Sequence, residues 1–306
     1  MSKHLSEIID IKRHFLKSIN INFDFGRSDA IEGYILQPSA KSLLTTLANH
    51  LTQTQQKAFT WTGPYGGGKS LLALTLASLA GGDKKLRKNA KSVLQTDETK
   101  PLIDYFSSDK PWLVLPITGK RTAIDKEIQA VLYENFQEKE KSKKNIIKQL
   151  KHIAETSSEH EGVLVIIDEL GKFLEHAAYT GDDIGFYQEL AETAARCKGK
   201  LVVIGILHQA FEQYASRLGT EAQQEWAKVQ GRYADISLLS SADETLSLIG
   251  KAILSDSKHQ NDTLLATTIA QLMPSQPQES FAQLLNACWP LHPLTALMLG
   301  LSLIHI

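Results

Sequence analysis

Residues 63–70 carry the residue types and the spacing most suggestive of chemistry. They read Gly-Pro-Tyr-Gly-Gly-Gly-Lys-Ser and match the pattern G-x-x-x-x-G-K-[ST]. Glycines at this spacing let a backbone fold around a phosphate chain with its N–H groups pointing inward. The ammonium group of Lys69 can then reach the β- and γ-phosphates, and the hydroxyl of Ser70 can hold Mg²⁺. We therefore expect a phosphate-binding loop made of Gly63, Pro64, Tyr65, Gly66, Gly67, Gly68, Lys69, Ser70 and Leu71.

A second candidate site lies at the end of an apolar run. Residues 163–167 are five consecutive apolar residues, and Asp168 and Glu169 follow them directly. Such a run is typical of a strand buried on both faces of a parallel sheet, and ligands bind at the carboxyl ends of such strands. Asp168 would hold the Mg²⁺ shell, and Glu169 would orient and activate an attacking water. The alternative is that Asp168 only caps the following helix.

The elements that must position these residues alternate between strands and helices. Residues 57–62 precede the glycine-rich loop as a run of aromatic and β-branched residues, which predicts a strand. Residues 71–80 follow it as an apolar helix that Gly81 and Gly82 stop. Further strands are predicted at 112–118, 162–168, 201–207 and 233–238, and further helices at 8–19, 38–51, 124–136, 143–155, 186–196, 210–230, 244–255, 264–273, 281–287 and 294–300.

Together the two sites resemble the Walker A and Walker B motifs of P-loop ATPases. A glutamate directly after the magnesium aspartate is similar to the division of these proteins that includes AAA+, STAND and helicase-type ATPases. In that division an extra strand lies between the P-loop strand and the Walker B strand, and residues 201–207 are the candidate. The resemblance implies an α/β fold, a P-loop NTPase three-layer sandwich with a central parallel five-stranded sheet, followed by the start of a helical lid domain. It also implies ATP and Mg²⁺ as ligands.

Two further roles follow from the same resemblance. A polar residue after the extra strand senses the γ-phosphate in this division, and either His208 or Gln209 fits that position; the alternative is a histidine that caps the next helix. Arg232, with Arg217 in reserve, stands where AAA+ proteins place an arginine finger. That arginine would act on the nucleotide of a neighbouring subunit in a homo-oligomer. The alternative for Arg232 is a surface salt bridge.

Four stretches, residues 63–70, 167–175, 207–215 and 225–233, together resemble large prokaryotic ATPases encoded in phage-defence operons, BREX-type systems among them. The resemblance implies a Mg²⁺-dependent ATPase that energises or gates an anti-phage defence complex of several proteins acting on DNA. A STAND-like switch shares the motifs and is the alternative: it would bind ATP, turn over slowly and oligomerise on sensing a phage component. The adjacent Asp-Glu pair disfavours a small-molecule kinase.

Composition limits the class of protein. The chain has 306 residues, enough for one large α/β domain and part of a second. Its net charge of −1 predicts no nonspecific attraction to nucleic acid or to an anionic membrane. Two cysteines make neither a disulfide framework nor a metal site, which fits a reducing cytoplasm. The N-terminus is polar, and no apolar run is long enough to span a bilayer.

The chain divides into four expected parts. Residues 1–56 are a helical lead-in, residues 57–240 the P-loop ATPase core and residues 241–300 the start of a helical lid domain. Residues 301–306 resemble the translation of the transposon end used to tag sequencing libraries. We therefore expect the natural protein to continue past Gly300.

Two places allow more than one interpretation. Tyr34 or Gln37 would lie near the adenine base, because a helix bordering the base often precedes a P-loop strand; the alternative is that Tyr34 is a core residue. The lysine-rich residues 84–91 would either contact nucleic acid or form a solvated helix face.

Overall fold

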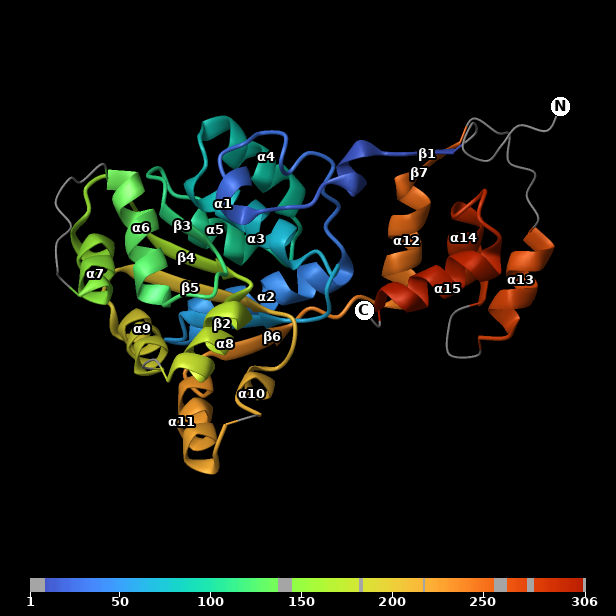
Figure 1. Cartoon of the computed structure of the whole chain (residues 1–306). Coiled ribbons are helices and arrows are strands. Elements are labelled where there is room, and N and C mark those ends of the chain that lie inside the picture. The colour runs from blue at the N-terminus through green and yellow to red at the C-terminus, as the bar shows by residue number, and fades with distance from the viewer. Residues whose placement is uncertain are drawn as a thin grey trace.

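A five-stranded parallel sheet forms the centre of the molecule (Figure 1). This computed structural model describes residues 9–136, 145–181, 184–216, 218–255, 263–273 and 278–304. The strands of the sheet are β2 (Ala58–Thr62), β3 (Leu113–Thr118), β4 (Gly162–Asp168), β5 (Lys200–Leu207) and β6 (Ala234–Ser237). Their spatial order is β3-β4-β5-β2-β6. Because β5 lies between β2 and β4, the predicted extra strand is confirmed.

Helices cover both faces of the sheet and make three layers. One face carries α2 (Pro38–Gln53), α3 (Lys69–Gly81), α4 (Lys84–Leu94) and α5 (Lys100–Phe106). The other face carries α6 (Ile124–Phe136), α7 (Ile146–Thr156), α8 (Leu170–Thr180), α9 (Gly185–Arg196), α10 (Phe211–Tyr214) and α11 (Thr220–Gln230). The expected α/β sandwich with a parallel five-stranded sheet is therefore confirmed.

Alternation along each strand explains the two cores. Trp61 of β2 and Ile166 of β4 pack on the α3 side, whereas Ala58 and Val165 pack on the α8 side. Every residue of β4 is buried. A strand covered on both faces needs a continuous apolar sequence, which is why the run before Asp168 has no polar residue.

The lysines of α4 lie on its solvent side. Lys84, Lys85, Lys88 and Lys91 are exposed, while Leu86, Ala90 and Leu94 on the same helix are buried. This is the arrangement of an amphipathic surface helix, as one of the two interpretations expected.

A separate helical region follows the sheet, shown in orange and red at the right of Figure 1. It consists of α12 (Ala242–Ala252), β7 (Ile253–Ser255), α13 (Thr263–Gln271), α14 (Gln278–Ala287) and α15 (Pro293–Ile304). Its own core includes Leu246, Phe281, Leu285 and Leu297. A helical region with a core of its own therefore follows the sheet, where the start of a lid domain was expected. In the described ranges, no helix combines the length and the apolar character needed to cross a bilayer.

The predicted helix over residues 8–19 is wrong. Residues Ile9–Ile11 form strand β1, which pairs antiparallel with β7, and Arg13–Leu16 form a 3-10 turn, η2. The helix predicted over 244–255 accordingly ends at Ala252, and its last residues form β7. The two β-branched residues Ile9 and Ile11 favour an extended backbone, and a partner strand from the far end of the chain lets them adopt it.

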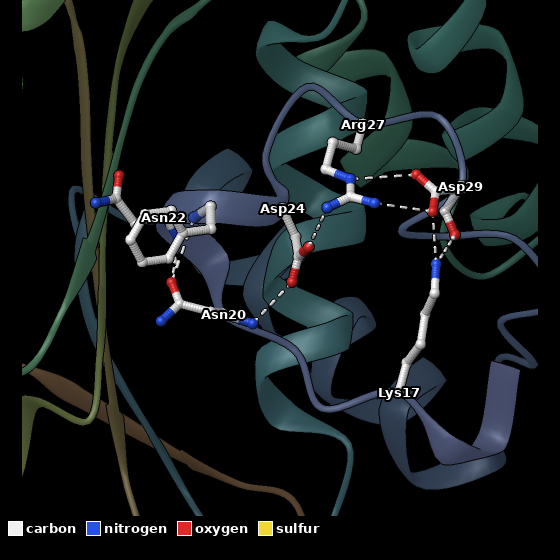
Figure 2. Close-up of polar contacts among 7 residues, drawn as sticks. Lys17, Asn20, Asn22, Asp24, Arg27 and Asp29 are labelled. Atoms are coloured by element: carbon white, nitrogen blue, oxygen red, sulfur yellow. Dashed lines mark hydrogen bonds and ion pairs between the residues drawn. The ribbon is translucent and has the colours of Figure 1, made fainter.

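The segment between β1 and α2 is held together by a polar cluster, which Figure 2 shows. Lys17 and Arg27 both contact the carboxylate of Asp29, at 2.7 and 3.2 Å. Arg27 also lies 3.7 Å from Asp24, which accepts a hydrogen bond from the backbone N–H of Asn20 at 2.9 Å. Hydrogen bonds from Lys17 and then Arg27 lower the pKa of Asp29 to about 2. Exposed pairs are individually weak, but here they share partners and close a loop.

Asn20 connects this cluster to the sheet. Its side-chain oxygen accepts hydrogen bonds from the backbone N–H groups of Asn22 and Phe23 and so caps the short helix α1 (Ile21–Asp24). The same oxygen accepts a hydrogen bond from the hydroxyl of Thr118 at 3.1 Å. Thr118 is the last residue of β3 and pairs with Asp168 of β4. The N-terminal segment therefore lies beside the edge of the sheet where the predicted carboxylates stand.

Candidate functional site

The loop at the carboxyl end of β2 is shaped by its glycines. Gly66 and Gly68 have φ angles of 76° and 77°, in the left-handed region that side chains disfavour. A Cβ added at either position would meet no described atom within 4 Å. At Gly63, in contrast, a Cβ would lie 2.3 Å from the carbonyl oxygen of Leu238. The loop is thus packed where it leaves the sheet and open where the motif expects phosphate, which fits a bound triphosphate.

Lys69 is the first residue of α3 and is only 4% exposed. Its Nζ donates hydrogen bonds to the carbonyl oxygens of Gly63 and Pro64, each at 2.6 Å. Burial lowers the pKa of Lys69 to about 8, and the negative charge of Asp168 opposes this effect. The ammonium group therefore sits inside the loop. The two residues that follow it, Ser70 and Leu71, form the first turn of α3.

Asp168 ends β4 next to this loop and is 4% exposed. Burial raises the pKa of its carboxyl group, while hydrogen bonds from Ser70 and from the backbone N–H of Glu169 lower it. The bond from the Glu169 N–H measures 2.9 Å. The two predicted Mg²⁺ ligands, Ser70 and Asp168, are therefore in contact. Both offer oxygen atoms, which are the ligands that Mg²⁺ prefers, so the site fits this ion.

Glu169 has a strained backbone. Its φ and ψ angles are 53° and 42°, and among the described residues it is the only non-glycine with a positive φ. A residue in this region costs about 1–3 kcal/mol and persists only where its surroundings enforce it. The close approach of Gly119, where a Cβ would lie 2.2 Å from the carbonyl oxygen of Glu169, is part of that enforcement. The carboxylate of Glu169 forms an ion pair with Lys172, one turn along α8.

His208 follows β5 and reaches the phosphate-binding loop. Its ring stacks on Tyr65, with 3.5 Å between ring centroids and 18° between ring planes. Both ring nitrogens are buried and find no hydrogen-bond partner among the described residues. Burial, followed by the charge of Lys69, lowers the pKa of His208 to about 4. Gln209, the other sensor candidate, is exposed.

Arg232 lies away from these residues. It precedes β6, which runs parallel to β2, and its carbonyl oxygen accepts a hydrogen bond from Gln56, just before β2. It therefore stands at the amino end of the strands, whereas the glycine-rich loop stands at the carboxyl end. The guanidinium of Arg232 pairs with Glu192 at 3.2 Å and is half-exposed. The reserve candidate, Arg217, lies outside the described residues.

The two candidates for the adenine site are both half-buried but have different surroundings. Tyr34 packs against the core on the α3 side, and burial raises the pKa of its hydroxyl. Gln37 is the residue before α2, and its side chain donates a hydrogen bond to the carbonyl oxygen of Ile35 at 3.4 Å. Tyr34 therefore has the environment of a core residue, which was the alternative interpretation.

Three residues that contact the candidate site were not predicted from the spacing of the sequence motifs. Lys172 forms an ion pair with Glu169, and Gly119 packs against the backbone of Glu169. Tyr214 lies between α8 and the end of β5, where its hydroxyl is hydrogen-bonded to the backbone of His208 and Gln209. A Cβ at Gly171 would lie 2.3 Å from that hydroxyl. No sequence signal pointed to these three. For the predicted His208, alternation along β5 adds support: Ile204 and Ile206 lie on the α3 side, and the next residue of that set is His208.

No protein-family model and no curated protein sequence matches the chain. Among solved structures, it is similar to the ORC2 protein of Aeropyrum pernix in ADPNP–ADP complexes, with 13% identity and a TM-score of 0.46 over 84% of this chain and 70% of that chain. It is also similar to Cdc6p from Pyrobaculum aerophilum, with 13% identity and a TM-score of 0.40 over 85% of this chain and 63% of that chain. A third similar structure is PCH-2 of C. elegans, with 12% identity and a TM-score of 0.34 over 90% of this chain and 73% of that chain.

Proposed function

We propose that the chain binds ATP with Mg²⁺ and hydrolyses it. One observation carries this proposal: the carboxyl ends of β2, β4 and β5 bring Lys69, the Ser70–Asp168 pair, Glu169 and His208 together. Ligands bind at this edge in open parallel sheets. An oxygen-lined cation site, a buried ammonium group, an open glycine loop and an adjacent carboxylate are the parts that phosphoryl transfer to water requires.

Each residue has a role that its surroundings support. The backbone N–H groups of residues 66–70 and the N-terminus of α3 would hold the phosphates, with Lys69 adding a positive charge. Bound Mg²⁺, held by Ser70 and Asp168, would neutralise charge on the phosphate oxygens. Glu169 would accept a proton from the attacking water. The ion pair with Lys172 restrains the Glu169 side chain at the end of β4.

We further propose an AAA+-type organisation. Residues 57–240 would form the ATPase core and residues 241–300 a lid, with residues 1–56 leading into both. The inserted strand β5 supports this organisation. Arg232 would then serve a neighbouring subunit, because it stands at the other edge of the sheet from the nucleotide site of its own chain. It would have to release Glu192 to do so.

The biological role we propose is to energise or gate an anti-phage defence complex that acts on DNA. Support for this role comes from the four sequence stretches that resemble defence ATPases. A STAND-like switch is the second candidate, and its support is the same pair of Walker motifs. The two differ in what stimulates them: a DNA-acting motor turns over faster on DNA, whereas a switch assembles on ATP with little turnover.

The test is ATP hydrolysis by the purified chain, with and without duplex DNA and with and without chelation of Mg²⁺. We expect the chain to hydrolyse ATP and chelation of Mg²⁺ to abolish this activity. The Glu169→Gln variant should still bind ATP but should not hydrolyse it. Stimulation by DNA supports the motor, and ATP-dependent assembly with slow turnover supports the switch. A protein that binds no ATP in the presence of Mg²⁺ contradicts both.

A further inference from the structure

The stack between Tyr65 and His208 joins the phosphate-binding loop to the end of β5. We propose that Tyr65 is a positioning residue, which holds the imidazole of His208 against the loop so that a ring nitrogen faces the reacting phosphate. This inference rests on the proposed function, since it assigns His208 its orientation in that site. It selects His208 over Gln209 and gives Tyr65 a role that the glycine-rich motif does not define.

The geometry of the pair is unusual for packing alone. Aromatic rings in proteins commonly sit 4.5–7 Å apart in offset or edge-to-face arrangements. The core pair Phe106 and Trp112 has such a geometry, with 4.7 Å between ring centroids and 47° between ring planes. The rings of Tyr65 and His208 are only 3.5 Å apart and nearly parallel, so one covers the face of the other. Tyr65 is nevertheless 56% exposed, so its position is not explained by burial in a core.

Strand pairing explains why these two residues meet. Thr62 of β2 lies opposite Leu207 of β5, and the N–H of Gly63 donates to the carbonyl oxygen of Leu207 at 3.3 Å. The two chains therefore leave the sheet side by side. His208 comes directly after β5, and the loop after β2 brings Tyr65 over its ring.

A second tyrosine fixes the backbone under the same histidine. The hydroxyl of Tyr214 is hydrogen-bonded to the backbone of His208 and Gln209. Tyr214 holds the backbone of His208 and Tyr65 covers its ring face, so the buried ring edge is the part that makes no hydrogen bond to a described residue. The nitrogens lie on that edge, and both lack a partner within the described part of the chain.

The unpartnered nitrogens indicate what the ring edge meets. Buried polar atoms in native proteins nearly always have a hydrogen-bond partner. The charges that act on His208 are those of Lys69, Glu169 and Lys172, so the ring lies among the residues of the proposed site. An oxygen of the γ-phosphate, or the water that attacks it, would supply the missing partner. Neutral imidazole can donate from one nitrogen and accept at the other.

The experiment compares Tyr65→Leu, which removes the stacking ring, with Tyr65→Phe, which keeps it. We expect Tyr65→Leu to lower kcat at least about 10-fold, because misorientation of a catalytic group is costly. Its affinity for ADP should stay within about threefold, a small change on the affinity scale. Tyr65→Phe should recover most of the lost kcat. Tyr179→Leu, which removes a 92% exposed tyrosine from α8, is the matched control.

Two further readouts separate positioning from loop stability. In a Tyr65→Leu/His208→Asn double variant, kcat should be no lower than in His208→Asn alone, because the two residues act as one unit. In NMR spectra of the nucleotide-free protein, loss of the ring current of Tyr65 should move the His208 imidazole proton signal downfield in Tyr65→Leu and not in Tyr179→Leu.

The outcomes distinguish this inference from the proposed function. Additive losses in the double variant, or an unmoved His208 signal in Tyr65→Leu, overturn the positioning role even if the chain hydrolyses ATP. A wild-type chain without ATP turnover overturns the proposed function, and with it the catalytic purpose of the stack. The NMR comparison then still decides whether the rings of Tyr65 and His208 are stacked.

Discussion

The carboxylate of Glu244 accepts hydrogen bonds from both the backbone N–H and the hydroxyl of Ser39, at 2.7 and 2.6 Å. Ser39 lies in the first turn of α2, whose N–H groups have no partner within the helix. Glu244 lies in α12, the first helix of the C-terminal region, and is 8% exposed. A residue of the helical region thus caps a helix of the sheet core, and this contact holds the two regions together.

Glu244→Ala should destabilise the protein by about 2 kcal/mol, because it leaves a buried backbone donor and a hydroxyl without their partner. The measurement is the denaturant midpoint, with Glu279→Ala, an exposed glutamate of α14, as the control. The loss should come with faster proteolysis of the connection between β6 and α12. Equal stability of Glu244→Ala and the control contradicts the cap.

Lys69→Ala should weaken ATP binding at least about 100-fold, since hydrogen bonds to a charged partner contribute up to about 3 kcal/mol each. Affinity can be measured by titration with a fluorescent ATP analogue. Lys91→Ala, in the exposed face of α4, is the matched control and should bind as wild type. A melting curve shows whether the variant is folded. A folded Lys69→Ala protein with wild-type affinity would remove Lys69 from the site.

Glu169→Gln should keep ATP binding and lower hydrolysis by about 10²–10⁴-fold, the usual contribution of a general base. The amide keeps the size of the carboxylate but cannot accept the proton. Glu175→Gln, further along α8 and exposed, should hydrolyse ATP as wild type does. Single-turnover hydrolysis of bound ATP is the direct measurement. Normal turnover in Glu169→Gln would assign the base to another residue.

His208→Asn should slow hydrolysis at least about 10-fold, whereas Gln209→Ala should leave it within about twofold of wild type. The reason is position: His208 contacts the glycine-rich loop, and Gln209 is exposed to solvent. Both variants are compared at saturating ATP, so that differences in ATP affinity do not affect the measured rate of hydrolysis. The reverse order of effects would make Gln209 the sensor.

His208 should also make stability depend on pH. Its pKa is lowered from 6.5 to about 4 in the folded chain by burial and by Lys69, with Lys172 acting in the same direction and Glu169 against it. The unfolded chain therefore binds the proton more readily. The contribution of His208 to the free energy of unfolding is fully present above pH 6.5 and is lost as the pH decreases from there towards 4.

The measurement for this effect is the unfolding free energy at about pH 7 and about pH 5 for wild type and His208→Gln. The loss on acidification should be smaller in the variant, which has no imidazole to protonate. His152→Gln, whose side chain lies on the surface helix α7, is the control for histidine content. An identical loss in His208→Gln and wild type would show that the imidazole is not held neutral.

The sheet could be predicted well from the sequence because the residues of a strand reflect how that strand is buried. All five strands were placed to within two residues. The clearest was β4, since a strand covered on both faces must be continuously apolar, as in residues 163–167. The two predicted motifs were equally local: their residues are neighbours in the chain, and the parallel order β4-β5-β2 brings both loops to the same edge of the sheet. The contact between Ser70 and Asp168 follows from that.

What the sequence did not predict depends on partners far along the chain. Residues 9–11 were expected to be helical because nothing nearby indicates that β7 will pair with them. The Tyr65–His208 stack, the capping of Ser39 by Glu244 and the backbone strain at Glu169 likewise arise only when distant segments meet. Such contacts have no periodicity or spacing from which they can be inferred.

The pairing of β1 with β7 has a consequence for how the protein is made. On the ribosome, β1 is synthesised before every strand of the sheet, and β7 after all of them. Domains commonly fold from the N-terminus during synthesis, and contacts of high sequence separation form slowly. The sheet and its glycine-rich loop can therefore assemble while β1 still lacks its partner. The helical region can then attach to the assembled sheet core in a later step of folding, when β7 becomes available to pair with β1.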